Sequence, residues 1–451
     1  MGLIKEEESS IKKIFGKVLR RDFSGNTGLA IKNSAYQFSS NIVQKLGSLV
    51  FVIILARIIL PETFGLYNLV FSTIMFFYVF SDAGIYGTLV YFTSKSLNRN
   101  KGKVKAYIDY LFKIKFFVVL MSAFALIILA KFIADSYYRQ PIFLALIAGS
   151  LYIIFMGLQN FYLAISQANN NFKNPFFKEI FFQISRMIVI PAAILYIRKF
   201  NLPNQTIVLT IFIILAIIAG LSMSLMHFLS IKDLNLQKIK KANLSKAEKA
   251  KIRKFMINLV LITSSILILG NIDKIIIGPF VPPEFVGYYS AAFSLVNASA
   301  FLLVFSDVFF PIFLRIKGKR LEQTFKKVAL ATFFMSFFLF SFLLIFATPL
   351  VNIIFGVNYI QSINMLRMLA FLALFFPLIE LYTSYIISKG NLDKIKKVVF
   401  FILIISIVLP LILVKTLSVY GNSMAVFGLI MGVLISKAAH LGSLMWISKR
   451  I

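Results

Sequence analysis

The sequence predicts an all-α polytopic membrane protein, with about twelve transmembrane helices in two six-helix lobes related by a parallel internal repeat. Three observations lead to this fold class. The 451 residues are 59% hydrophobic with a mean hydropathy of +0.87, more apolar than a soluble surface tolerates. Long apolar stretches recur along the whole chain, and a short motif occurs twice, about half a chain length apart.

The apolar stretches have the length of membrane-spanning helices. A helix needs about 20 mostly apolar residues to cross a bilayer, because its backbone polar groups must be satisfied within the segment. Twelve such windows run over 34–57, 64–92, 107–130, 141–166, 175–197, 205–230, 255–278, 285–314, 324–352, 362–388, 397–417 and 421–447.

The basic residues orient these spans. Lys and Arg number 48 against 17 Asp and Glu, a formal net charge of +31. Of the 48, 35 lie in the set of connections that includes the N-terminus and 5 lie in the opposite set. Positive loops face the cytoplasm, so we expect a plasma-membrane protein with both termini cytoplasmic. The charge reports topology, and no nucleic-acid partner is expected.

The same boundaries divide the chain into domains. These are a cytoplasmic basic N-terminus (1–33), an N-lobe (34–230), a cytoplasmic linker (231–254), a C-lobe (255–447) and a cytoplasmic tail (448–451). Residues 11–21 have the pattern of an amphipathic helix on an anionic leaflet, although a basic tail without regular structure explains them equally well. In the linker, Ser245 and Glu248 have the spacing of a capping box.

The repeat relates the two lobes. The motif P-E-x-x-G-x-Y occurs at 61–67 and again at 283–289, and a second similarity links 165–169 to 387–391 at the same offset of 222 residues. Because six spans separate the copies, both lobes enter the membrane from the same side. In the motif we expect Pro to end a helix, Gly to allow close backbone approach, and Tyr to lie in an interfacial aromatic belt.

The stretch 55–67, Leu-Ala-Arg-Ile-Ile-Leu-Pro-Glu-Thr-Phe-Gly-Leu-Tyr, resembles the signature of Wzx-type polysaccharide biosynthesis flippases in the multidrug/oligosaccharidyl-lipid/polysaccharide (MOP) exporter superfamily. Residues 271–274 and 286–289 look like the matching C-lobe signature. The resemblance implies that membrane lipids and a polyprenyl phosphate- or pyrophosphate-linked oligosaccharide are partners, together with glycan-assembly proteins. Lipid II flippases of this superfamily commonly have two additional helices, which this chain lacks.

Polar and basic residues inside the spans are the candidate substrate-binding groups, because charge in a bilayer usually faces a cavity or a partner. In the first span a polar stripe recurs every three to four residues, at Ser34, Gln37, Asn41, Gln44, Lys45 and Ser48. It lines a wet cavity or packs against another polar helix. The candidates for a cationic cavity are Lys45, Arg186, Arg367 and Lys437, with Gln37, Asn41 and Gln44 beside them. Snorkelling or pairing with an acid is the structural alternative.

Acidic residues inside the spans are candidates for coupling to a proton or sodium gradient. The acids within the spans are Asp82, Glu179, Asp273, Asp307 and Glu380, and each could instead be a salt-bridge partner for a base. Asp82, Asp273 and Glu380 are the coupling candidates. Asp109 and Lys113 are four residues apart, and this spacing predicts a local ion pair.

An enzyme is not expected. The chain has no Cys and two His residues, which leaves little material for metal or nucleophilic chemistry. It has no P-loop, so an ATP-driven pump is also disfavoured. No cofactor is expected. The alternatives to an oligosaccharide flippase are a cation-coupled multidrug exporter, a lipid II flippase and a scaffold for glycan-assembly enzymes.

Overall fold

A computed structural model describes residues 25–97, 99–234, 239–301, 303 and 306–450. Within these ranges the regular secondary structure is helical, with no strand, which confirms the predicted all-α class. The predicted amphipathic segment 11–21 lies outside the described residues.

The helices divide into two consecutive groups. The first comprises α2 (Gly25–Ile58), α3 (Pro61–Phe80), α4 (Ile85–Ser96), α5 (Lys101–Lys131), the π-helical turn η1 (Phe132–Tyr138), α6 (Phe143–Ala168), α7 (Lys173–Arg198) and α8 (Asn204–Leu234). The second begins with α9 (Lys246–Leu269), α10 (Ile272–Ile277), α11 (Pro283–Phe301), α12 (Ser306–Arg315), α13 (Gly318–Ile345) and α14 (Ala347–Ile354). It ends with η2 (Val357–Tyr359), α15 (Ser362–Leu369), α16 (Leu372–Ser388), α17 (Leu392–Leu417), η3 (Ser418–Tyr420) and α18 (Asn422–Lys449).

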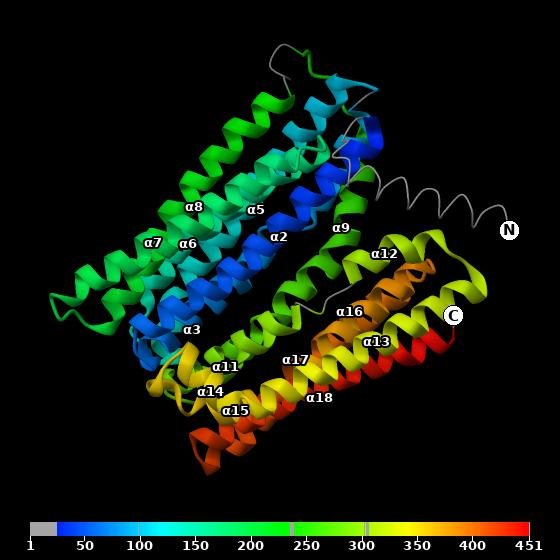
Figure 1. Ribbon diagram of the computed structural model, residues 1–451. Helices are drawn as coiled ribbons and strands as arrows, with labels where there is room; N and C mark the ends of the chain where they lie inside the picture. Colours follow the sequence, from blue (N-terminus) through cyan, green and yellow to red (C-terminus); the bar gives the residue numbers. More distant parts are fainter. Residues whose placement is uncertain (1–24, 98, 235–238, 302, 304–305, 451) are drawn as a thin grey trace.

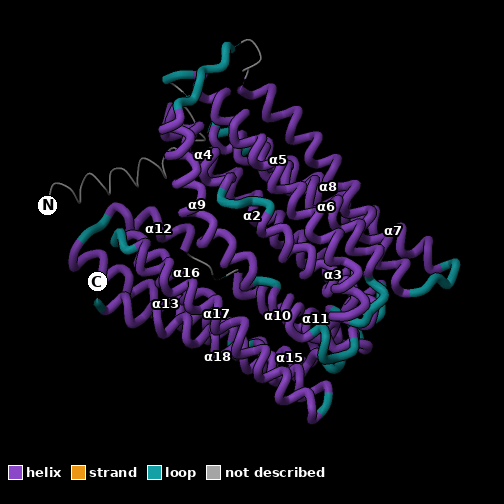
Figure 2. Tube along the Cα trace, turned by 180° about the vertical axis from the view of Figure 1, so that it is seen from behind, coloured by secondary structure: helices purple, strands orange, loops and turns teal. Residues whose placement is uncertain are grey.

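These groups form two lobes that meet at one end and diverge at the other. Figure 1 shows α3 of the first lobe against α11 of the second, whereas the lobes separate toward the end that carries α12 and the C-terminus. The view from behind shows the same arrangement (Figure 2). Helix α9 lies between the lobes and contacts α3 and α4 on one side and α17 on the other. We call the joined end, where α3 meets α11, the seam.

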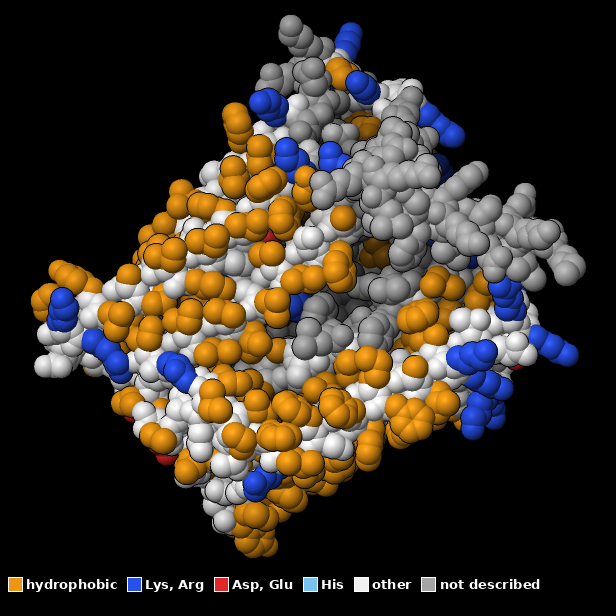
Figure 3. Space-filling model, in the orientation of Figure 1, with side chains coloured by type: hydrophobic (Ala, Val, Ile, Leu, Met, Phe, Trp, Pro, Cys, Tyr) orange, Lys and Arg blue, Asp and Glu red, His pale blue; other side chains and the backbone are white. Residues whose placement is uncertain are grey.

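The outer faces of both lobes are apolar. Large side chains such as Phe117 and Phe338 are 64% and 74% exposed. Figure 3 shows hydrophobic side chains over most of one face, with Lys and Arg gathered toward its ends, and a hollow where the lobes diverge. Ten helices of the described part are long and apolar enough to cross a membrane. An apolar belt of this kind is typical of a multi-pass membrane protein.

Several predicted spans are interrupted helices. The window 64–92 divides into α3 and α4, because Ala83 and Gly84 have φ values of +46° and +70° and turn the chain. The windows 255–278 and 285–314 coincide with α9 and α10, and with α11 and α12. A hydropathy window averages over such breaks, so it finds the span and misses the bend.

The linker is anchored on the first lobe. Lys103 Nζ lies 2.7 Å from Glu248 Oε1, and the backbone N–H of Ala242 donates to the carbonyl of Gly102 at 3.1 Å. The predicted capping box is confirmed, since the side chain of Ser245 accepts from the Glu248 N–H and that of Glu248 accepts from the Ser245 N–H. The hydrogen bond from Lys103 and that from the Ser245 N–H hold the pKa of Glu248 below its usual value.

One predicted ion pair in this region is wrong. The carboxylate of Asp109 lies 2.9 Å from Lys241 Nζ, a linker residue, and not on Lys113. Spacing along a helix identifies only local partners, whereas the linker brings a competing ammonium group from 132 residues away in the sequence.

Candidate functional site

The first lobe holds a half-buried guanidinium between α2 and α7. Arg186 donates from Nη2 to Ser48 Oγ at 2.8 Å. Its guanidinium carbon lies 4.7 Å from the ring centroid of Phe51 and 5.4 Å from that of Phe182. Its Nε is buried without a hydrogen-bond partner among the described residues. Two aromatic faces therefore hold the cation in place while one donor stays unused.

Glu179, the acid nearest to Arg186 in the sequence, is engaged by other residues. Glu179 accepts from Lys178 Nζ at 2.7 Å and from Gln183 Nε2 at 2.6 Å, and all three side chains are buried. Gly47 makes room for Gln183, because a Cβ atom at position 47 would lie 2.7 Å from Gln183 Oε1. The group formed by Ser48, Glu179, Gln183 and Arg186, called the N-lobe cluster below, thus contains one carboxylate and, with Lys178, two cations.

The predicted polar stripe of α2 leads into this cluster. Gln37 donates to Asn41 Oδ1 at 3.1 Å, and both side chains are half-buried. Gln44 and Lys45 are exposed. Ser48, four residues beyond Gln44, packs against Arg186. The stripe therefore meets another polar helix at one end and stays accessible at Gln44 and Lys45.

The second lobe holds a buried carboxylate with two different partners. Tyr289 donates from its hydroxyl to Asp273 Oδ2 at 2.6 Å, and Lys274 Nζ lies 3.4 Å from Asp273 Oδ1. All three residues are at most 7% exposed. The ammonium of Lys274 also lies 4.8 Å from the ring centroid of Phe293. Asp273 and Lys274 pair although they are sequence neighbours, because α10 is only one and a half turns long and both side chains point into the lobe.

Two other predicted residues lie near this carboxylate. Lys437 Nζ is 5.8 Å from the ring centroid of Phe376, and the acids whose charges act on it are Asp273 and Glu380. Glu380 is exposed. His440 is buried beside Lys437, and its Nε2 has no partner among the described residues. Asp273, Glu380 and Lys437 are therefore brought together from α10, α16 and α18.

The third predicted acid lies elsewhere. Asp82 occupies the turn between α3 and α4, where Lys115 Nζ of α5 lies 3.3 Å from Asp82 Oδ1 and donates to the carbonyl of Ser81 at 2.9 Å. Lys115 is 1% exposed. The partner of Asp82 is therefore Lys115, in the middle of α5, and not one of the four predicted cavity cations.

Arg367 lies at the seam end of the second lobe. Its Nη2 donates to Thr348 Oγ1 of α14 at 3.3 Å, and its Nη1 donates to Asn364 Oδ1 at 3.4 Å. The residue is exposed. It is thus separate from the group around Lys437, although both belong to the same lobe.

Hydrogen bonds cross between the lobes at the seam. Arg57 of α2 donates to the carbonyls of Ile353 and Ile354 at the end of α14, the second at 2.7 Å. Tyr137 of η1 donates to the carbonyl of Ile275 at 3.0 Å. Charged donors to carbonyls at a helix C-terminus are favourable.

The two copies of the P-E-x-x-G-x-Y motif meet at the centre of the seam. A Cβ atom at Gly65 would lie 1.7 Å from the carbonyl oxygen of Pro283, and one at Gly287 would lie 2.2 Å from that of Pro61. Each proline begins its helix, at the position where a missing N–H costs nothing. The repeat therefore places glycine against the other copy's first turn, in a pseudo-symmetric pair.

The motif tyrosines were misjudged from the sequence. Tyr67 and Tyr289 are 5% and 0% exposed, so they do not lie in an interfacial belt. Tyr289 binds Asp273, and Tyr67 lies within electrostatic range of Arg186. Each copy of the motif thus connects the seam to the charged group of its own lobe. The only signal of this role in the sequence was the repeat itself, in which each tyrosine follows its glycine by two residues.

Comparison with known proteins identifies the family and the fold. Residues 30–317 match the family model described as polysaccharide biosynthesis protein. No curated protein sequence matches the chain.

Solved structures of membrane transporters are similar to this chain. A lipid II flippase, MurJ, in an inward closed conformation has 16% identity and a TM-score of 0.67, over 93% of this chain and 87% of its own. An inward-facing multidrug resistance MATE family transporter of the MOP superfamily has 14% identity and a TM-score of 0.65, over 90% and 94%. An outward-facing structure of such a transporter has 14% identity and a TM-score of 0.56, over 94% and 95%.

Proposed function

This chain belongs to the polysaccharide biosynthesis protein family, and on that premise we propose that it is a flippase for a lipid-linked oligosaccharide. It has the two-lobed fold of a MOP transporter. The proposed cargo is carried on a polyprenyl phosphate or pyrophosphate and moves from the inner to the outer leaflet of the plasma membrane. The oligosaccharide crosses between the lobes while the lipid tail stays in the bilayer.

The observation that carries this proposal is the N-lobe cluster. Its arginine has an unused donor, and its only carboxylate is engaged by Lys178 and Gln183. A guanidinium held on aromatic faces suits a phosphate, which accepts two parallel hydrogen bonds. Lys45, exposed on the same helix as Ser48, would add a second cation. Desolvating an anionic head group requires such charge-assisted bonds.

Alternating access follows from the two ends of the molecule. The basic loops and the linker support a cytoplasmic location of the diverging end, so the seam would close the outer side. The cargo would enter between the diverging lobes, and parting of α3 from α11 would release it outward. The higher TM-score with inward-facing than with outward-facing transporters supports this assignment.

Coupling to an ion gradient would use the second lobe. Asp273 accepts a hydrogen bond from the Tyr289 hydroxyl and forms an ion pair with Lys274. Tyr289 lies two residues from the seam glycine Gly287. Protonation of Asp273, or binding of sodium by it, would change the bonds to Tyr289 and Lys274, and with them the packing at the seam. Glu380 would supply the accessible carboxylate. Asp82, paired with Lys115, would serve as a structural ion pair.

Reconstituted flipping tests the proposal. Protein in liposomes is given a fluorescent polyprenyl pyrophosphate-linked oligosaccharide, and label reaching the opposite leaflet is quenched from outside. Wild-type protein should flip it. Arg186→Gln should reduce the rate by about tenfold or more, since a hydrogen bond to a charged group contributes roughly 1.5–3 kcal/mol. Arg186→Lys should recover part of the rate.

Arg139→Gln is the matched control, because Arg139 is exposed on a turn at the seam end. Equal rates for wild type and Arg186→Gln would contradict the assigned role of Arg186. Flipping of no lipid-linked oligosaccharide, with export of amphipathic cations instead, would favour the multidrug exporter.

A further inference from the structure

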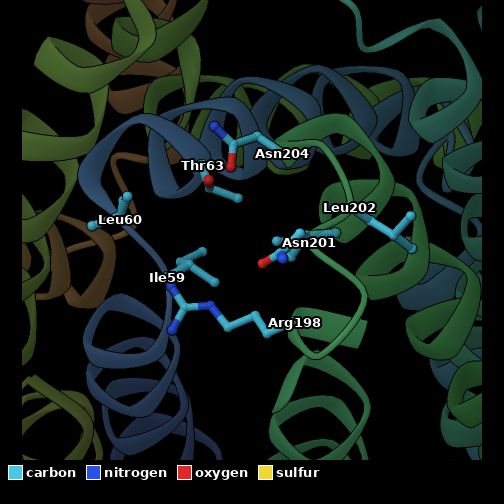
Figure 4. A pocket seen from close by; sticks show the side chains of 8 residues that line it. Ile59, Leu60, Thr63, Arg198, Asn201, Leu202 and Asn204 are labelled. Carbon is cyan, nitrogen blue, oxygen red and sulfur yellow. The ribbon is translucent and has the colours of Figure 1, made fainter. Parts of the chain in front are cut away.

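A polar cavity lies beside the seam on the first lobe. It has a volume of about 240 Å³ and opens between the end of α7 and the turn that joins α2 to α3. Figure 4 shows Arg198 reaching from α7 toward Ile59, with Asn201 directed into the same space and Thr63 at its rim. The carbonyl of Ile59 also accepts a bond from Tyr359 of the second lobe at 3.5 Å. The cavity therefore borders the line along which the lobes would part.

Its hydrogen-bonding groups are unused. In the part of the chain that the structure describes, the guanidinium of Arg198 and the amide of Asn201 make no hydrogen bond or ion pair. Thr63 lines the cavity, and its hydroxyl likewise has no described partner. Arg198 and Asn201 are exposed, so all three groups can donate to a ligand that enters the cavity. The nearby carboxylate of Glu62 is engaged by Asn204 Nδ2 at 3.1 Å.

The internal repeat shows that the fold does not require every polar group of this cavity. At the 222-residue offset, Thr63 corresponds to Phe285. The equivalent turn of the second lobe keeps a cation and an amide, since Lys415 lies in the last turn of α17 and Asn422 begins α18. Thr63 is therefore the polar group that distinguishes the first lobe at this place.

The surroundings indicate an amphipathic ligand. Tyr196 and Phe200 flank Arg198, are 63% and 59% exposed, and contact each other with ring centroids 5.4 Å apart. Exposed aromatic residues next to Arg198 and Lys199 are typical of the membrane–water interface. A ligand here would keep its tail in the bilayer and present its polar head to the cavity.

We propose that this cavity binds the phosphate of a lipid head group in the leaflet at the seam end. Arg198 would bind the phosphate through its guanidinium, with Asn201 and Thr63 donating to other oxygens of the head group. Two sources share this chemistry: a resident anionic phospholipid and the phosphate of a transported carrier lipid. The site itself does not depend on the proposed cargo, since it rests on the cavity and its free donors.

Native mass spectrometry of the full chain in detergent tests the site. The probes are phosphatidylglycerol, a polyprenyl phosphate and, as an uncharged comparison, diacylglycerol. Wild-type protein should retain one phosphate lipid in preference to diacylglycerol. Arg198→Gln should weaken its binding about tenfold, and Asn201→Gly, which suits the φ of +49° at this position, should weaken it less. Arg139→Gln, an exposed arginine at the same end, should bind like wild type.

Competition between the two phosphate lipids identifies the source. Displacement of phosphatidylglycerol by the polyprenyl phosphate assigns the cavity to the carrier lipid, and retention of phosphatidylglycerol assigns it to a resident lipid. Equal retention of phosphate lipid by wild type and Arg198→Gln would overturn the proposal. The flipping assay with Arg186→Gln reports separately on the central site, so each proposal can fail alone.

Discussion

Substitution of a seam glycine should open the joined end of the molecule. In Gly65→Ala the new methyl carbon would lie 1.7 Å from the carbonyl oxygen of Pro283, whereas such atoms normally stay about 3.5 Å apart. The first turns of α3 and α11 must therefore separate by roughly 2 Å. Overpacking of this kind typically costs about 1–3 kcal/mol. When the seam is open the methyl group touches nothing, so the cost falls on the closed state alone.

A free-energy difference of about 1–3 kcal/mol corresponds to a shift of roughly 5- to 150-fold in the equilibrium between closed and open seams. The chain has no Cys, so Lys199→Cys and Val419→Cys provide two unique sites for spin labels. These residues lie on the α7–α8 and α17–α18 turns of the two lobes. Double electron–electron resonance should show a longer distance population in Gly65→Ala than in the wild type.

The control is Gly442→Ala, since a Cβ atom at this helical position would meet nothing within 4 Å. Its distance distribution should match that of wild type. Because Gly65 and Gly287 share one contact, the double substitution should cost less than the two single costs added. An unchanged distribution in Gly65→Ala would refute the reasoning that the glycine pair holds the seam closed.

Three further predictions concern other parts of the molecule. Arg57→Gln should also lengthen the seam distance in the same label pair, since it removes charged donors to two carbonyls of α14. Lys115→Met should lower the free energy of unfolding by about 3–5 kcal/mol, measured by denaturation in detergent, because it leaves the carboxylate of Asp82 buried and unpaired; Lys115→Met with Asp82→Asn should recover much of that loss. The docking of the linker should weaken as the pH falls below 4.5, the ordinary pKa of Glu248. Lys103 lowers the pKa of Glu248 in the folded chain, so the ion pair stabilises docking fully above pH 4.5. This stabilisation is lost when Glu248 is protonated. Hydrogen exchange of the linker against pH measures this, and Glu248→Gln should reduce the pH dependence without abolishing it, because the linker also pairs with Asp109 through Lys241.

Much of the fold could be predicted because its signals are local. The length of each apolar window follows from the thickness of the bilayer, and the capping box at Ser245 and Glu248 depends on residues three apart. The structure contains both features, the long apolar helices and the capping box. The break at Ala83 and Gly84 was missed, because a window average does not respond to two residues that turn the chain.

The candidate site could be predicted only as a set of residues. Charge inside a span indicates function or pairing, and the sequence could not say which. Asp82 pairs with Lys115, Arg367 lies with Thr348, and Lys437 lies near Asp273 and Glu380. These outcomes depend on which helices are neighbours and how each is rotated. Neither is encoded in the spacing along one helix.

The sequence by itself determined that this protein crosses a membrane many times, that its basic loops share one side, and that its halves are copies. These properties follow from hydrophobicity, charge count and repetition, each of which is read along the chain. Only the tertiary structure decided that the two copies of one motif face each other, with Gly65 against Pro283 and Gly287 against Pro61. A backbone approach this close is a property of two helices packed together, and the same glycine in an isolated helix would be only a weak point.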